Sequence, residues 1–390
     1  MGRSRQGSRP GYTLPYSGLM TSPPPDGRWN LQKVTRNPWG EIPLTGGGEF
    51  LNQHAKRYYE RLLGFAEATD TDARRHHYVP KTHLKRWSSD GKRVWTLNTD
   101  TGALKQLGVN DICVAENFYR VIGPDGEAHN RVELMFGAVD EEVRRIQDIL
   151  LALGKRSDIS FEDFMAAGVT AALQRMRTSQ SRRLMEQQDL WWGEQQADGF
   201  SSPLADEDPL RLNNIHTESL FHAMWEAADV MTTRQLEIWD DPKGRFLTSD
   251  APVQTSFVGD VRPGLNAAKT IWWPISPHRA VAWTNELAGE KVVFKRATTP
   301  IADKVRAIML QGRDRFIIAT QEQLRTLPAG KPIPRRAQMR LRCSQHQPSG
   351  EYVEPPGCVV ETREWYGSAP SVLLCNNGLH RHVPELASHR

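Results

Sequence analysis

A long stripe of apolar residues at helical spacing constrains the fold of this chain more than any other feature of its sequence. Residues three, four and seven apart lie on one face of an α-helix, so residues 129–154 are expected to form a long amphipathic helix closed by Gly154. The stripe consists of Val132, Met135, Phe136, Val139, Val143, Ile146, Leu150 and Leu153. Ser160 and Asp163 resemble the start of a capping box, which indicates a second helix over 161–192. A third helix is expected over roughly 215–238.

The pattern changes to short β-rich runs near Arg245. These runs are separated by Pro, Gly and Asn, and they read RFLTS, VQTSFV, TIWWPIS, AVAWT, KVVFKR and RFIIAT. Such runs are typical of strands, and the segment TPIADKVRAIMLQG predicts one helix among them. Earlier in the chain, KRVWTLNTDTGALKQL has turn residues between two apolar runs and predicts a β-hairpin. The fold class that follows is α+β, a helix-rich first half followed by a mixed, mainly antiparallel sheet.

The two ends of the chain differ from this central part. Residues 1–50 contain Pro23, Pro24, Pro25 and a glycine run, and they have few aliphatic residues, so we expect a disordered or loosely docked arm. Residues 51–72 predict a helix and an acidic linker. The main α+β domain is expected over 73–328, followed by a basic, Cys- and His-rich tail over 329–390.

Composition limits the environment and the partners. The net charge of +4 permits a nucleic-acid partner without requiring one. No run of 18 apolar residues is present, so no membrane partner is expected. Four cysteines in 390 residues do not form a disulfide scaffold, which favours a reducing, cytoplasmic location.

The segment RRHHYVPKTHLKRW, residues 74–87, has three histidines and five Lys or Arg. Pro80 restricts the preceding residue to extended geometry, so His77 and Val79 are expected on one face of a strand. A short helix follows, on which His83 and Trp87 cluster. Tyr78 and the basic residues Lys81, Lys85 and Arg86 are the candidates for contacting a substrate, with a solvated basic surface as the alternative.

Several motifs together resemble a bacterial family known as domain of unknown function 4238. In order along the chain they are HHYVPKTHLKRW, VNDICVAENFY, LQRMRTSQSRR, FLTSDAPV, IWWPISPHRAVAW and VRAIMLQGRDRFIIA. The resemblance covers roughly residues 76–320 and is most specific at its His-Tyr-Val-Pro and Ser-Asp-x-Pro motifs. It singles out as landmarks His77, Tyr78, Pro80, Arg177, Asp250 and Pro252. The family implies no chemistry.

A catalytic set can be assembled from three of these landmarks. His77 and Asp250 could act as an oriented general base or share a divalent metal, and Arg177, expected in mid-helix, could clamp a phosphate. The alternative is a structural network in which Asp250 caps a turn, Arg177 pairs with it and the histidine bonds a carbonyl. Glu133, Asp140 and Glu141 lie on the first long helix, where a solvated acidic face is expected.

The tail holds three of the four cysteines and four of the twelve histidines. Thiolate and imidazole ligands suit tetrahedral zinc, and the candidate ligands are Cys343, His346, Cys375 and His380. An unstructured or simply docked tail is the alternative. The basic run KPIPRRAQMRLR before it provides a second local basic patch.

The function expected from these features is a metal-dependent nuclease or related phosphodiesterase acting on nucleic acid, in a bacterial defence setting. The enzyme class would be hydrolase. A non-catalytic nucleic-acid-binding or interaction module with a zinc-stabilised tail is the alternative, and a small-molecule hydrolase or modifying enzyme is a third.

Overall fold

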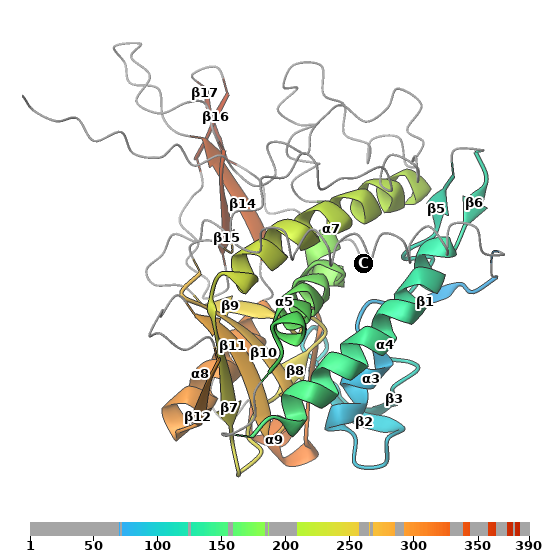
Figure 1. The fold of residues 1–390 in the computed structure, drawn as a ribbon. Coiled ribbons are helices and arrows are strands. Elements are labelled where there is room, and N and C mark those ends of the chain that lie inside the picture. The colour runs from blue at the N-terminus through green and yellow to red at the C-terminus, as the bar shows by residue number, and fades with distance from the viewer. Residues whose placement is uncertain are drawn as a thin grey trace, which may run out of the picture.

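A computed structural model describes the greater part of the chain between residues 70 and 327, with four tail strands beyond it (Figure 1). The described residues before the tail are 70, 72–123, 126–154, 159–183, 186, 209–256, 265, 268–284 and 292–327. The predicted arm at 1–50 and the predicted helix that follows it lie outside the described residues.

Three long helices lie together on one side of the molecule (Figure 1). They are α4 (Arg131–Ala152), α5 (Phe161–Met176) and α7 (Pro209–Thr232). The predicted apolar stripe of α4 is buried along its whole length. The Ser160 hydroxyl accepts the Asp163 N–H at 3.1 Å, as the capping prediction requires.

Two predicted helix boundaries were wrong. The helix predicted over 161–192 breaks after Met176, and Arg177 is its C-cap residue. The hydroxyl of Thr178 accepts the N–H of Ser181 at 3.2 Å, which begins a new helical turn and explains the break.

The predicted third helix ends at Thr232, and residues 235–240 form a strand instead. Leu236 and Ile238 point to the same face of that strand and are fully buried. Burial between two strand partners overrides the helical continuation that the local sequence suggests.

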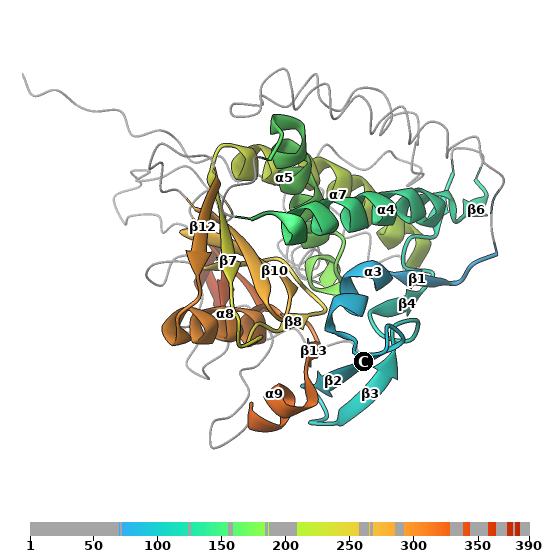
Figure 2. The same cartoon turned by 60° about the horizontal axis from the view of Figure 1, so that its bottom comes forward.

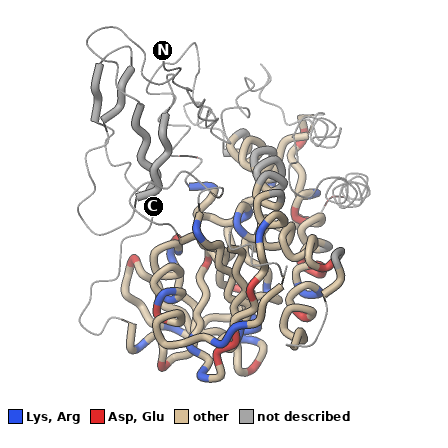
Figure 3. Tube along the Cα trace, turned by 60° about the vertical axis from the view of Figure 1, so that its left-hand side comes forward, with Lys and Arg blue, Asp and Glu red and all other residues tan. Residues whose placement is uncertain are grey.

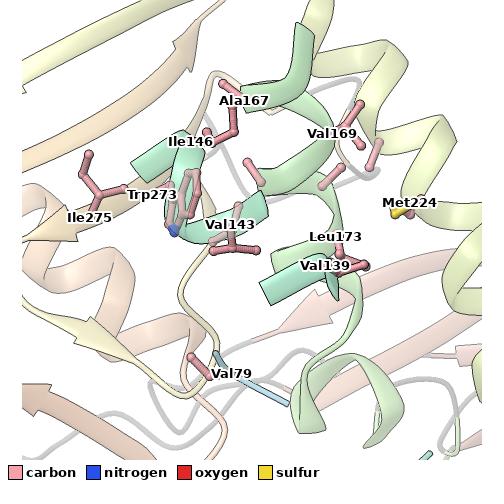
Figure 4. Close-up of a cluster of buried hydrophobic side chains, with 14 of the residues drawn as sticks. Val79, Val139, Val143, Ile146, Ala167, Val169, Leu173, Met224, Trp273 and Ile275 are labelled. Carbon is pink, nitrogen blue, oxygen red and sulfur yellow. The ribbon is translucent and has the colours of Figure 1, made fainter. Parts of the chain in front are cut away.

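A five-stranded mixed sheet packs against these helices. Its order is β12-β7-β11-β10-β9, in which only the pair of β12 and β7 is parallel. The strands are β7 (Gln235–Asp240), β9 (Gln254–Ser256), β10 (Thr270–Ser276), β11 (Arg279–Thr284) and β12 (Val292–Arg296). Trp273 and Ile275 of β10 meet α4 and α5 in the larger hydrophobic core (Figure 4).

A second, four-stranded antiparallel sheet contributes side chains to both hydrophobic cores. Its order is β3-β2-β13-β8. The strands are β2 (Arg93–Asn98), β3 (Leu104–Gly108), β8 (Thr248–Ser249) and β13 (Phe316–Ala319). The predicted hairpin is therefore confirmed as β2 and β3, and Gly102 supplies the left-handed conformation in its turn, with φ of 69°.

The second core lies between the two sheets and helix α8 (Thr299–Gly312), which was predicted. Trp272 of β10 points into this core, whereas its neighbours Ile271 and Trp273 point toward the long helices. The short helix α9 (Gln321–Thr326) closes it with a complete capping box between Thr320 and Gln323.

Smaller elements complete the fold. They are β1 (Arg75–His77) with β4 (Val114–Glu116), α3 (Lys81–Leu84) with the 3-10 turn Lys85–Trp87, β5 (Val121–Ile122) with β6 (Ala128–His129), and the tail pairs β14 (Gln338–Cys343) with β15 (Cys358–Arg363) and β16 (Leu373–Asn376) with β17 (Leu379–His382). The predicted α+β class, with helices before the main sheet, is confirmed. Among the described helices, none is long and apolar enough to cross a membrane.

Candidate active site

The segment from His76 to Pro80 lies beneath α4 and is almost completely enclosed. Both views of the ribbon place β1 and α3 beside α4 (Figures 1 and 2). His76 is fully buried between the Ala73 carbonyl, 3.0 Å from Nε2, and the Tyr119 N–H, which donates to Nδ1 at 2.8 Å. Both ring nitrogens of His76 are therefore used, and its role is structural.

His77 differs from its neighbour because one ring nitrogen is left without a partner. The residue is 8% exposed, and its Nε2, itself a buried atom, makes no hydrogen bond within the described residues. The ring bonds the Val109 carbonyl, so Nδ1 must carry the proton and Nε2 a lone pair. Burial, and then the nearby Lys81 charge, lower the pKa of His77 to about 4. The imidazole is consequently neutral and can accept a proton at neutral pH.

Arg177 holds the main chain of His77 in place. Its Nη2 donates to the His77 carbonyl at 2.7 Å, and its Nη1 donates to the Asp140 carboxylate at 2.5 Å. The guanidinium also lies 4.4 Å from the centre of the Phe136 ring. Because the side chain is fully buried and both terminal nitrogens bond the protein, these contacts favour a positioning role over the predicted phosphate clamp.

Two carboxyl groups of α4 face this cluster. Glu133 and Asp140 are seven residues apart and so share a helix face. Burial raises the pKa of Glu133 to about 7, and the Asp140 charge adds to the rise. Arg177 opposes it, and so does the main-chain N–H of His77, which donates to the carboxylate. The other oxygen, Oε2, has no hydrogen-bond partner within the described residues.

The prediction of a solvated acidic face on this helix was wrong for Glu133 and Asp140, and correct for Glu141, which is exposed. The position of Glu133 and Asp140 relative to the apolar stripe could have identified them from the sequence. Glu133 and Asp140 flank the apolar stripe, next to Phe136, and therefore belong to the side that packs on the protein rather than to the side facing water.

Asp250 occupies a different network. Its two oxygens accept three main-chain N–H groups, those of Asp314 at 2.9 Å, Arg315 at 2.7 Å and Phe316 at 2.9 Å. The side chain is fully buried. Burial first, and then the Asp314 carboxylate, raise the pKa of Asp250 to about 7, against the three N–H donors that lower it. This geometry matches the structural alternative, in which Asp250 caps a turn. The expected partner Arg177, however, pairs with Asp140 and not with Asp250.

The two most specific family motifs meet at Tyr78 and Asp250. The Tyr78 ring is buried, and burial together with the charges of Cys113 and Asp250 raises the pKa of its phenol. Its main-chain N–H donates to the Cys113 carbonyl at 3.0 Å. Cys113 has a φ of 56°, which is uncommon for a residue other than glycine. Tyr78 therefore joins the end of β1 to the segment before β4 through a hydrogen bond, and it lies close enough to the turn after β8 to feel the charge of Asp250.

The predicted basic contacts lie at the edge of the His77 cluster. Lys81 and Lys85 are exposed, and Arg86 forms an ion pair with Asp148. Lys81 alone of the three influences the pKa values of His77, Glu133 and Asp140, which places its charge beside them. His83 and Trp87 are buried together, with ring centres 4.9 Å apart, as predicted.

The predicted metal sites stay predictions. Of the zinc candidates, His346 lies outside the described residues, and the side chains of Cys343, Cys375 and His380 are not described. The strand register pairs Cys375 with His380. Across the described side chains no group of three or more His, Cys, Asp or Glu is placed to hold a metal. At the predicted divalent site, the Asp250 carboxylate is already engaged by three N–H groups.

The chain belongs to the family described as "Protein of unknown function (DUF4238)", whose model matches residues 75–323. This match confirms the resemblance expected from the motifs. No curated protein and no solved structure matches the chain.

Replacing Glu133 by glutamine should stabilise the protein above neutral pH. The folded-state pKa of about 7 lies above the usual 4.5, so the folded protein loses stability relative to the unfolded chain as pH rises from about 4.5 through 7. Glutamine removes that loss, and the gain at pH 8 relative to pH 5 should reach about 1–3 kcal/mol. Urea unfolding of both proteins at the two pH values measures it. A gain that does not grow with pH would show that the Glu133 pKa is not raised.

Proposed function

We propose that this protein is a phosphodiesterase acting on nucleic acid, with its active site at His77, Glu133 and Lys81. One observation carries the proposal. A buried histidine, whose Nε2 has no partner within the described residues and whose pKa is about 4, donates its main-chain N–H to a carboxyl group that has an unpartnered oxygen and a pKa of about 7. Groups whose surroundings push their pKa values apart are typical of acid–base pairs in active sites.

The two groups suit opposite roles in phosphodiester cleavage. Neutral His77 accepts a proton from the attacking hydroxyl through Nε2, and protonated Glu133 donates one to the leaving oxygen. Lys81 is exposed beside both of them and places a positive charge where the phosphate gains negative charge. Arg177 is a positioning residue, because it binds the His77 carbonyl rather than the substrate.

Attraction of a phosphate backbone would depend on local groups and not on the whole surface. In the view of Figure 3, basic and acidic positions of the described chain lie interspersed. The exposed Arg74, Arg75, Lys81 and Lys85 surround the entry to β1 and α3. They supply a local basic edge of the kind that contacts phosphates.

The wider setting is part of the proposal. A hydrolase in the bacterial cytoplasm, active in defence, agrees with the scarce cysteines and with the cluster described above. The alternative is a non-catalytic module that binds nucleic acid at the same basic edge. Measurable turnover separates the two, since a module binds without cleaving.

Removing the Lys81 charge tests the proposal. The Lys81→Ala variant should lose roughly tenfold in kcat/KM on a fluorescent oligonucleotide, because about 1.4 kcal/mol of charge stabilisation is lost from the transition state. Lys105→Ala removes an equally exposed lysine on β3 and should cleave like the wild type. The proposal fails if the wild type cleaves no oligonucleotide of either sugar type. It also fails if the two variants lose activity equally, since a diffuse charge effect would then suffice.

A further inference from the structure

We propose that the tail binds one zinc ion through Cys343, Cys358, Cys375 and His380. The proposal is independent of the proposed function, because it concerns only the strands β14 to β17. The strand register carries it. In the first tail pair, β14 with β15, Cys343 lies directly opposite Cys358. In the second tail pair, β16 with β17, Cys375 lies directly opposite His380. Cys358 thus takes the place that the sequence prediction gave to His346.

The first tail pair has two unlike faces, and the cysteines share the more apolar one. Directly opposed residues of antiparallel strands lie on the same face, with Cβ atoms about 4.5–5.5 Å apart. Alternation along β14 places Met339 and Leu341 on the face of Cys343. Arg340 and Arg342 lie on the other face. The cysteine pair therefore belongs to the face that a second element is expected to cover.

The second tail pair is adjacent and supplies two further ligands. Cα atoms of β14 and β16 lie within 8 Å of one another, although the two pairs form separate sheets. Figure 1 draws them next to each other. Strand β16 carries Cys375, and its register partner on β17 is His380. Three thiolates and one imidazole form one of the usual tetrahedral sets of structural zinc.

A metal would supply stability that these strands otherwise lack. Each tail pair has only two strands, and an isolated two-stranded pair is marginally stable in water. Binding of a structural zinc ion contributes directly to folding free energy. The segment leading into the site favours thiolates, because it is basic and has no acidic residue. Its basic residues are Lys331, Arg335, Arg336, Arg340 and Arg342.

A disulfide between Cys343 and Cys358 is the competing chemistry. Directly opposed cysteines lie at the separation that a disulfide spans. A disulfide, however, requires an oxidant and uses only two of the four residues that the register pairs. Zinc requires no oxidant and uses all four, so the register favours the metal.

Metal analysis of the full-length protein, purified without a histidine tag and in the presence of a reductant, tests the proposal. We expect one zinc ion per chain in the wild type. The Cys358→Ser and Cys375→Ser variants should each retain at least roughly tenfold less zinc after dialysis. Replacing zinc by Co²⁺ in the wild type tests the ligands without a substitution. The cobalt protein should show thiolate-to-metal charge-transfer absorption, which grows with the number of bound thiolates.

Two histidine variants are the matched controls. His346→Ala should keep its zinc, because the register does not require this residue. His382→Ala should keep it as well, since His382 lies opposite Leu373 and not opposite a cysteine. Loss of zinc in His346→Ala with retention in Cys358→Ser would overturn the proposed ligand set. A wild type that stays free of zinc after incubation with Zn²⁺, or that has a Cys343–Cys358 disulfide under reductant, would overturn the metal site itself.

Discussion

The Asp250→Ala variant is expected to lose about 3–5 kcal/mol of unfolding free energy, the largest stability effect that we predict for a single substitution. The alanine leaves three main-chain N–H groups, those of residues 314–316, without their acceptor; the first is buried and the other two are partly buried. These residues lead into β13, the strand between β2 and β8, so their loosening affects one edge of the second core. Urea unfolding at pH 8, where the wild-type carboxylate is ionised, gives the difference.

Two further variants make that measurement specific. Asp250→Asn keeps one acceptor oxygen and should lose less than the alanine variant. Asp111→Ala removes an exposed aspartate that pairs with Arg75 at the surface, and should change stability by no more than about 1 kcal/mol. If Asp250→Ala retained wild-type stability but lost cleavage, the structural role would be contradicted and the catalytic role predicted from the sequence would be supported.

The His77→Ala variant is expected to lose about 10²–10⁴-fold in kcat/KM while remaining folded. Its Nε2 makes no hydrogen bond in the described structure, and the alanine removes only the bond from the ring to the Val109 carbonyl, so we expect a moderate loss of stability beside the larger loss of activity. Cleavage rates of a fluorescent oligonucleotide, together with a urea unfolding curve, measure both properties in one preparation.

His278→Ala is the matched control, because it removes an exposed histidine in the turn between β10 and β11. Its cleavage rate should equal that of the wild type. Full activity in His77→Ala would show that the base lies elsewhere. Loss of folding in that variant, with activity and stability falling together, would support a structural role for the ring.

The sequence predicted those parts of the fold whose local signals agree with their tertiary surroundings. The stripe of α4 is buried as expected, and the hairpin of β2 and β3 follows from the turn residues at 98–102. The errors occurred where distant contacts decide. Strand β7 follows α7 with no proline or glycine between them, and only its pairing with β11 and β12 makes it a strand.

The site was predicted in part. His77 and Arg177 do come together, but through the His77 carbonyl, and no sequence pattern reports which main-chain group an arginine contacts. Glu133 was missed because a carboxylate beside an apolar stripe looks like one on a solvated face until the neighbouring segment is placed over it. Asp250 was assigned to His77 because their motifs are the most specific, whereas the groups that it bonds are the main-chain N–H groups of residues 314–316.

The pH dependence of cleavage tests the central claim most directly. With His77 as base and Glu133 as acid, kcat/KM on an oligonucleotide should be highest between about pH 4 and pH 7, and should fall tenfold per unit above pH 7. In Glu133→Gln the rate should be lower and this alkaline fall should disappear. A rate that rises above pH 7, or a fall that stays at the same pH in Glu133→Gln, would contradict the assignment of His77 and Glu133 as the catalytic pair.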